Sequence, residues 1–373
     1  MKKYMHDWQA ADMERWQQAM EIIKRISKEG DKAYLTGGAV RDKLLGKEPA
    51  DIDIASSVSA EKLEKIFGRT VPAGNRKETF LIFPFGEPVE ITKLKGSTIE
   101  EDLALRDFTC NAAAVDTAEN VIDPFKARKA ISEKILHPVV SAEKTFKDDP
   151  LRLIRAVRLS VKLQFSLSRE IITSYKQMSG LIKQTPAERI YLELSKLGRH
   201  QITKSDWVNV YPLLKQLPLG LFEDTSLYEG LLKITPVFTP EQWWTVILYG
   251  NSAVWPGRAL PKKILKHVRK THSFLSEDRW DNMAFYEAGR TVIQSAVLIK
   301  LLKGESFAED PLLQFDRLPI HSVRDLKVSG RDLLHMESRE IGRTLSILEK
   351  AVVTGKVSND RKKLITYIEG ENQ

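Results

Sequence analysis

The stretch Gly37-Gly38-Ala39-Val40-Arg41-Asp42, followed by Asp51-Ile52-Asp53, decides the fold of the N-terminal part of the chain. Its glycines follow the short apolar run 33–36, which predicts a strand, and they precede a helical pattern over 40–45. Glycines at such a junction let a phosphate approach backbone N–H groups at the start of a helix. The sequence therefore predicts a phosphate site at Gly37 and Gly38.

Asp51 and Asp53 lie two residues apart in a run that alternates polar and apolar residues, as a strand over 51–54 would. Side chains at this spacing on a strand share one face, so the two carboxylates are placed to hold a hard divalent cation. Glycines beside such a pair are typical of nucleotidyl transfer with two Mg²⁺ ions. Either motif alone is equally compatible with an ordinary surface turn. We predict Asp51 and Asp53 as catalytic, metal-binding residues, with Glu90 on a neighbouring strand as a candidate third carboxylate.

The composition is that of a globular protein with a basic surface. The chain has 373 residues, of which 42% are hydrophobic, and Lys plus Arg exceeds Asp plus Glu by 8, which favours a polyanionic partner. The single cysteine, Cys110, excludes an intrachain disulfide and a cysteine zinc cage and favours a reducing cytoplasm. No apolar run approaches the roughly 20 residues of a membrane span, and acidic residues interrupt the N-terminal segment. We therefore expect a cytoplasmic protein without a signal peptide.

Two patterns divide the chain. Up to about residue 140, helical and strand signals alternate, with helices expected over 7–28 and 59–67 and strands over 79–84 and 88–94. Beyond that point strand signals nearly vanish. Amphipathic helices are then predicted over residues 143–163, 168–183, 186–199, 206–217, 226–234, 241–249, 261–275, 281–302 and 338–354. The fold class is an α/β head followed by an elongated all-α remainder.

Residues 37–55 resemble the first motif of the class II tRNA nucleotidyltransferases, the CCA-adding enzymes and their relatives in the polymerase-β-like superfamily. Three further motifs follow in the family's order, at 105–112, 148–158 and 186–196, and the segment 326–334 matches more weakly. The resemblance implies a polymerase-β-like nucleotidyltransferase head over 1–140, a helical neck over 141–200, a helical body over 201–310 and an RNA-binding helical tail over 311–373. It also implies addition of nucleotides to the tRNA 3′ end with two Mg²⁺ ions and with CTP, and in some members ATP, as substrate.

The same motifs imply which residues bind the nucleotide. In the family, residues at the positions of Arg41 and Arg106 contact the triphosphate and ribose, and an acidic–basic pair selects the base. Lys162 continues the row of basic residues that follows, but we assign it to a solvated face. The nucleotide-binding residues that the resemblance implies are Gly37, Gly38, Arg41, Arg106, Asn111, Asp149, Arg152, Arg155 and Arg158.

The chemistry of Asp149 and Arg152 fits the choice of a base. In a helix over 143–163 they would be i and i+3 neighbours. A carboxylate only accepts hydrogen bonds and a guanidinium only donates them, so the pair matches the amino group and ring acceptor of cytosine or adenine and rejects uracil and guanine. An intrahelical salt bridge is the structural alternative.

A basic cluster in the helical part is the candidate RNA-binding surface. Family members bind the tRNA acceptor stem and elbow with this part, although a solvated helix face explains the cluster equally well. The cluster comprises Lys262, Lys263, Lys266, Arg269 and Lys270.

The chain departs from the family pattern between residues 92 and 100. CCA-adding relatives carry a flexible loop there, tied to the switch from C to A addition, and about a dozen of its residues are missing around Gly96. Leu105 also replaces an arginine of the second motif. We therefore favour a CC-adding enzyme over a complete CCA-adding enzyme. A bacterial poly(A) polymerase and a non-catalytic RNA-binding protein are the remaining alternatives.

Overall fold

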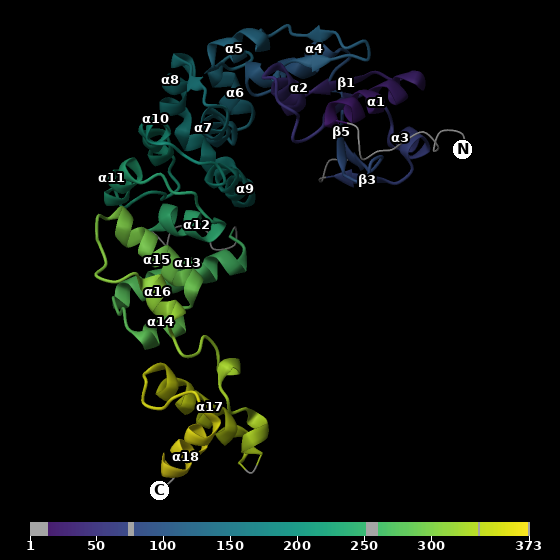
Figure 1. The fold of residues 1–373 in the computed structure, drawn as a ribbon. Coiled ribbons are helices and arrows are strands. Elements are labelled where there is room, and N and C mark those ends of the chain that lie inside the picture. Colours follow the sequence, from purple (N-terminus) through teal and green to yellow (C-terminus); the bar gives the residue numbers. More distant parts are fainter. Residues whose placement is uncertain (1–13, 74–77, 251–259, 335, 372–373) are drawn as a thin grey trace. The chain divides into compact units, whose positions relative to one another are not determined.

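The computed structural model describes residues 14–73, 78–250, 260–334 and 336–371. The chain divides into two compact units, residues 1–185 and 186–373, which are described separately below (Figure 1). The finer division into head, neck, body and tail stays a prediction. The helix expected over 7–28 is α1 (Arg15–Lys28), and the expected residues 7–13 lie outside the described residues.

The first unit is built on a mixed sheet with strand order β3-β4-β5-β2-β1-β6-β7. The central pair β2–β5 is parallel and the other neighbours run antiparallel. We predicted β1, β2, β4 and β5 with small errors at their ends, but not β3. The strands are β1 (Ala33–Thr36), β2 (Asp53–Ser56), β3 (Thr70–Ala73), β4 (Thr79–Ile82), β5 (Val89–Lys93), β6 (Ala114–Val115) and β7 (Val121–Ile122).

Helices cover both faces of this sheet. In Figure 1, α1 and α3 (Ala60–Phe67) lie next to the strands, and Leu35 and Ile54 join their apolar core. On the other face, Ala55 packs in a second cluster with residues of α4 (Ile99–Ala104). Because side chains alternate along a strand, Asp53 shares the face of Ala55. The alternation therefore directs the Asp53 side chain toward α4.

The remaining elements of the first unit are mostly helical. The helix predicted over 143–163 is broken: α6 (Ala142–Asp148) ends before Asp149, and α7 (Arg152–Leu163) begins three residues later. Pro150 explains the break, because a residue before proline avoids the helical region. The others are α2 (Gly37–Leu44), η2 (Thr109–Asn111), α5 (Ala127–Glu133), α8 (Arg169–Met178), η3 (Ser179–Gln184) and the parallel pair β8 (Ile135–Leu136) and β9 (Ser166–Leu167).

The second unit is helical throughout its described residues. The predicted helix 281–302 divides at Gly289, and we did not predict α16 or α18. None of the described helices is long and apolar enough to cross a membrane. The elements are α9 (Ala187–Gly198), α10 (Lys204–Gln216), α11 (Ser226–Lys233), α12 (Pro240–Leu248), α13 (Lys262–Glu277), α14 (Asn282–Ala288), α15 (Arg290–Leu302), α16 (Pro311–Asp316), η4 (Val323–Asp325), η5 (Gly330–Leu333), α17 (Ser338–Val353) and α18 (Arg361–Glu371).

Two helical glycines of this unit should respond to alanine in opposite directions. A Cβ at Gly230 in α11 would overlap the backbone of Leu302, whereas a Cβ at Gly342 in α17 would meet no atom within 4 Å. Gly230→Ala should therefore lower the free energy of unfolding by about 1–3 kcal/mol through overpacking. Gly342→Ala should raise it by up to about 1 kcal/mol through helix propensity. Denaturant unfolding of both variants tests this, and a stabilising Gly230→Ala would contradict the close approach of α11 to α15.

Candidate active site

The glycine turn closes directly over Asp53. Helix α2 begins at Gly37 itself, and the Gly38 N–H donates to Asp53 Oδ2 at 3.3 Å. Gly37 has φ +65°, and a Cβ there would lie 3.0 Å from the same carboxylate oxygen. Glycine is therefore required at position 37 by both backbone conformation and space. The predicted junction of strand, glycines and helix is confirmed, and it places the start of α2 beside a carboxylate.

Asp51 does not lie on the strand, so our premise that both aspartates share one strand face is wrong. It is exposed in the bend before β2, which begins at Asp53. Its negative charge nevertheless raises the pKa of Asp53, so the two carboxylates lie within electrostatic range of each other. Asp51 belongs to the connection between α2 and β2, so strand geometry does not fix the direction of its side chain.

Asp53 is the group best suited to a divalent cation. Burial raises its pKa above the ordinary value, and the opposing effects of Arg106 and the Gly38 N–H do not cancel this. The raised pKa indicates that nearby positive charge does not fully compensate the buried Asp53 carboxylate. Carboxylate oxygens are also ligands that Mg²⁺ prefers. Glu90 is the register partner of Asp53 on β5 and faces the same side of the sheet. Among the described residues, however, no group of three or more His, Cys, Asp or Glu converges as a metal cage.

Arg106 is held beside the glycine turn by a buried carboxylate. Asp102, only 3% exposed, accepts from Arg106 Nε at 3.2 Å and from Nη2 at 2.8 Å. Arg106 Nη2 also donates to Thr36 Oγ1 at 3.1 Å. A Cβ on Gly37 would lie 3.3 Å from Arg106 Nη1, so the guanidinium borders the turn. An arginine oriented in this way presents a fixed positive charge to a ligand at the glycines.

A chain of hydrogen bonds joins α2 to α7 through η2. Arg41, 4% exposed, donates to Asn111 Oδ1 at 2.7 Å and to Asp42 Oδ1 at 2.6 Å. Asn111 Nδ2 donates to Asp107 Oδ1 at 3.0 Å, and Arg155 Nη1 lies 3.3 Å from Asp107 Oδ2. Burial of Asp107 opposes its ionisation, but Arg155, Asn111 and a backbone N–H outweigh it and hold its pKa below the ordinary value. The chain joins three of the nucleotide-binding candidates, Arg41, Asn111 and Arg155.

Asp149 and Arg152 flank the start of α7 instead of sharing a helix, so the predicted i, i+3 geometry is wrong. Asp149 has extended backbone angles, φ −151° and ψ 102°, and its Oδ1 accepts from the Leu151 N–H at 3.2 Å. Arg152 Nη2 donates to the Leu105 carbonyl at 2.6 Å, and its buried Nε has no hydrogen-bond partner. The two side chains are thus anchored separately, which disfavours the intrahelical salt bridge.

The shortened connection after β5 is a tightly bonded turn. Gly96 has φ +85°, and a Cβ there would overlap the Glu101 side chain. Glu101 Oε2 accepts from the Ser97 N–H at 2.6 Å and, with Thr98, forms a capping box at the start of α4. The Lys95 N–H donates to Asp102 Oδ1 at 3.1 Å. Asp102 therefore binds both the turn and Arg106.

The basic cluster on α13 forms an exposed face in the second unit. The opposite face of the helix is buried through Ile264, Val268 and Phe274. Lys263 pairs with Glu241 of α12 at 3.0 Å, which neutralises one of its charges. The buried His267 contacts Ser295 Oγ at 2.9 Å and belongs to the packing. The exposed cluster residues are Lys262, Lys263, Lys266, Arg269 and Lys270.

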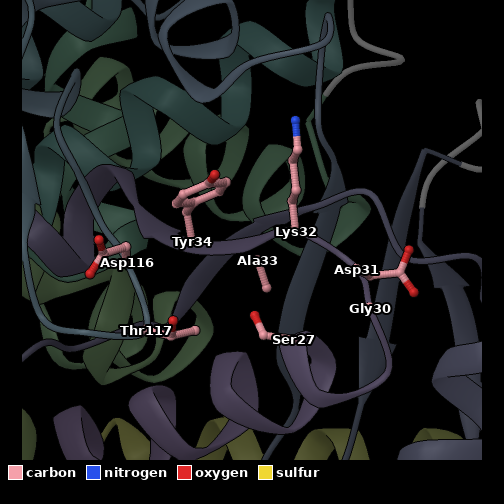
Figure 2. Close-up of a pocket in the computed structure, with 8 residues that line it drawn as sticks. All are labelled: Ser27, Gly30, Asp31, Lys32, Ala33, Tyr34, Asp116 and Thr117. Carbon is pink, nitrogen blue, oxygen red and sulfur yellow. The ribbon is translucent and has the colours of Figure 1, made fainter.

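A pocket of about 290 Å³ lies at the other end of β1. Figure 2 shows Ser27, Lys32, Tyr34 and Asp116 around it, with Ala33 at the start of the strand. The glycine turn follows the last residue of the same strand. This pocket is therefore separate from the candidate site.

Sequence reasoning missed three carboxylates that orient the site. Asp42 and Asp107 stand inside quoted motifs, and Asp102 lies four residues before Arg106, which is the spacing of a helical ion pair. That spacing was the available signal for Asp102. Nothing local distinguishes Asp107, because its partner Arg155 is 48 residues away.

Comparisons with known proteins agree with this geometry. A family model described as the poly A polymerase head domain matches residues 33–97 and 86–137, and one described as tRNA nucleotidyltransferase domain 2, putative, matches residues 256–368. A CC-adding tRNA nucleotidyltransferase of Shouchella clausii is 30% identical, with 95% of this chain and 98% of that protein covered. The CCA-adding enzyme of Bacillus subtilis is 29% identical, covering 94% and 97%.

Solved structures share the fold along the whole chain. The Bacillus stearothermophilus CCA-adding enzyme in complex with CTP aligns with a TM-score of 0.78 at 28% identity, covering 96% of this chain and 97% of that one. The Thermotoga maritima CCA-adding enzyme complexed with tRNA has a TM-score of 0.68 at 20% identity, covering 95% of each chain, which indicates a common fold alone. The fold class expected from the motifs is confirmed. The chain therefore belongs to the family of CC-adding and CCA-adding tRNA nucleotidyltransferases.

Proposed function

We propose that this enzyme adds two C residues from CTP to the 3′ end of tRNA without a nucleic-acid template. The observation that carries the proposal is the separate anchoring of Asp149 by the Leu151 N–H and of Arg152 by the Leu105 carbonyl. Both side chains belong to the unit that contains Asp53 and Arg106. A base-reading pair and a candidate phosphate and metal site thus occur in one compact unit.

The base is selected by fixed donors and acceptors. Asp149 accepts a bond from the Leu151 N–H, and its carboxylate has further lone pairs that can accept from the amino group of cytosine. Arg152 is held by the Leu105 carbonyl, and its further N–H groups can donate to the cytosine ring acceptor. Uracil would place an acceptor against the carboxylate and leave buried polar groups unpaired, which costs about 1–3 kcal/mol for each group.

The remaining candidates hold the nucleotide and the metal. Gly37 and Gly38 let phosphates approach the start of α2, while Arg41 and Arg106, with Arg155 and Arg158 of α7, supply positive charge. Asp53 and Asp51, with Glu90 as the third carboxylate, would hold Mg²⁺. Held there, Mg²⁺ would supply activation of the attacking hydroxyl and neutralisation of charge on the departing pyrophosphate.

The bonded turn at Gly96 supports CC addition over complete CCA addition. Adenine is larger than cytosine, so an Asp149–Arg152 pair set for cytosine must move to read it. Such a shift needs an element with two arrangements. The residues around Gly96 are instead fixed by Glu101 and Asp102. The relatives named above include both CC-adding and CCA-adding enzymes, so complete CCA addition is the alternative.

The exposed basic face of α13 is our proposed tRNA-binding surface, because arrays of lysine and arginine bind phosphate backbones. The Thermotoga maritima relative was solved with tRNA, which supports tRNA as the partner. The acceptor stem and elbow remain the predicted points of contact. We place the reaction in the cytoplasm, consistent with a single buried cysteine.

Asp53→Asn should abolish nucleotide addition without unfolding the protein. Loss of the carboxylate should reduce CTP incorporation by at least about a thousandfold if the metal contributes several kcal/mol. Burial raises the folded-state pKa of Asp53, so its ionised form at neutral pH disfavours folding. The thermal midpoint of the metal-free variant should therefore be equal or higher. Asp31→Asn, which alters an ion pair with Lys62, is the control. Normal turnover by Asp53→Asn would reject the assignment.

Asp149→Ala and Arg152→Ala should relax base choice. Each removes half of the base-reading pair while the phosphate contacts remain, so the ratio of UTP to CTP incorporation should rise by about tenfold or more. Competition assays with labelled nucleotides measure this ratio. Asp148→Ala is the matched control, because the neighbouring Asp148 is exposed and pairs only with Lys144 among the described residues. Lost activity with unchanged selectivity would show that the pair is structural.

Products formed from tRNA lacking CCA, with CTP and ATP present together, should end in CC. Sequencing of the product 3′ ends measures this. Insertion of a CCA-type loop between Lys95 and Thr98 should restore some A addition, because it replaces the turn that Glu101 fixes. Efficient A addition by the unmodified enzyme would overturn the CC assignment and leave the CCA-adding alternative.

A further inference from the structure

The basic face of α7 extends beyond the two arginines of the proposed nucleotide site. Arg155, Arg158 and Lys162 are spaced by three and four residues, so they fall on one face of the helix. Arg155 contacts Asp107, which identifies this face as the one directed toward the segment that precedes η2. The other face is buried through Leu153, Ala156, Val157, Ser160 and Val161. Lys162 therefore continues the site by one helical turn.

Lys162 lies within electrostatic range of Arg41 and Asp42 in α2. Partial shielding of its ammonium, followed by the charge of Arg41, lowers its pKa, and Arg158 acts in the same direction against Asp42 and Asp51. The residue as a whole is exposed. Among the described residues, Lys162 has no hydrogen-bond or ion-pair partner, whereas Asp42 is paired with Arg41 at 2.6 Å. The exposure of Lys162 agrees with the solvated face to which we assigned it, and it leaves the ammonium accessible to a ligand.

Charged groups of both signs lie within electrostatic range of Lys162. The cations Arg41 and Arg158 lower the pKa of Lys162, and the carboxylates Asp42 and Asp51 oppose them. A divalent cation on Asp51 would neutralise one of the two carboxylates and make the surroundings of Lys162 more positive. Like charges brought together in a folded protein repel one another unless an anion binds among them. The surroundings of Lys162 are therefore those of an anion site.

We propose that Lys162 binds the phosphate tail of the incoming nucleoside triphosphate. The inference rests on the proposed function and adds a residue to its site. Arg41 is buried and already donates to Asp42 and Asn111, whereas Lys162 carries a flexible ammonium with three donors. A phosphate of the tRNA 3′ end offers the same chemistry, and the experiment below distinguishes the two sources.

The test is equilibrium binding of CTP and of CMP to the full-length enzyme with Mg²⁺ and without tRNA. Lys162→Gln should weaken CTP binding about tenfold, as expected for one lost charge-assisted contact. CMP binding should change by less than about twofold, since CMP lacks the tail. Lys162→Arg should keep most of the affinity for CTP. Lys176→Gln, at an exposed lysine of α8, is the matched control and should change neither affinity.

Equal CTP affinity in Lys162→Gln and the unaltered enzyme would overturn the inference. Equal losses for CTP and CMP would also overturn it, because the effect would then lie at the base or ribose. If Lys162→Gln lost affinity for tRNA but not for CTP, Lys162 would bind the phosphate of the tRNA 3′ end. The proposed contact with the triphosphate would then be rejected. If the unaltered enzyme failed to bind CTP, the proposed function itself would fail, which is a distinct result.

Discussion

The buried carboxylate of Asp107 is the interaction on which the arrangement of the site depends. It accepts from the Phe108 N–H at 2.8 Å and from Asn111 at 3.0 Å, and it pairs with Arg155 at 3.3 Å. Through Asn111 it holds Arg41, which borders Gly38, and through Arg155 it ties α7 to the same network. Loss of Asp107 would remove the shared partner of Asn111 and Arg155 at once.

The same interaction makes the site sensitive to acid. The folded-state pKa of Asp107 lies below its ordinary value. Its contribution to stability is therefore present above the unfolded-state pKa and is lost as the pH falls through the folded-state pKa. Asp53 behaves in the opposite sense, because its pKa is raised. Ionised Asp107 thus stabilises the fold. Ionised Asp53 instead carries an unfavourable charge that a bound cation would compensate.

The sequence predicted the fold well where local rules dominate. Glycines between a strand and a helix, alternation in β1 and β2, and amphipathic helices each leave a local pattern. The pattern failed at Asp149, where Pro150 breaks the helix that the apolar spacing predicted. It also failed at Asp51. The alternation of polar and apolar residues predicted a strand from residue 51, whereas β2 begins at Asp53.

Contacts between distant residues could not be predicted from local pattern. Asp107 meets Arg155 across 48 residues, and Arg152 meets the Leu105 carbonyl across 47. Resemblance to the family supplied most of the candidate residues, but not the reason that each holds its position. The reason for each position emerges only in the folded structure, where buried carboxylates orient the arginines and a bonded turn fixes Asp102 beside Arg106.

The most direct test of this account is a crystal structure of the enzyme with CTP and Mg²⁺. The account predicts the cytosine amino group within hydrogen-bond distance of Asp149, the ring acceptor within reach of Arg152, and the phosphates at the Gly37–Gly38 turn. A cytosine bound away from Asp149 and Arg152, with these side chains still held by Leu151 and Leu105, would contradict selection of the base by this pair.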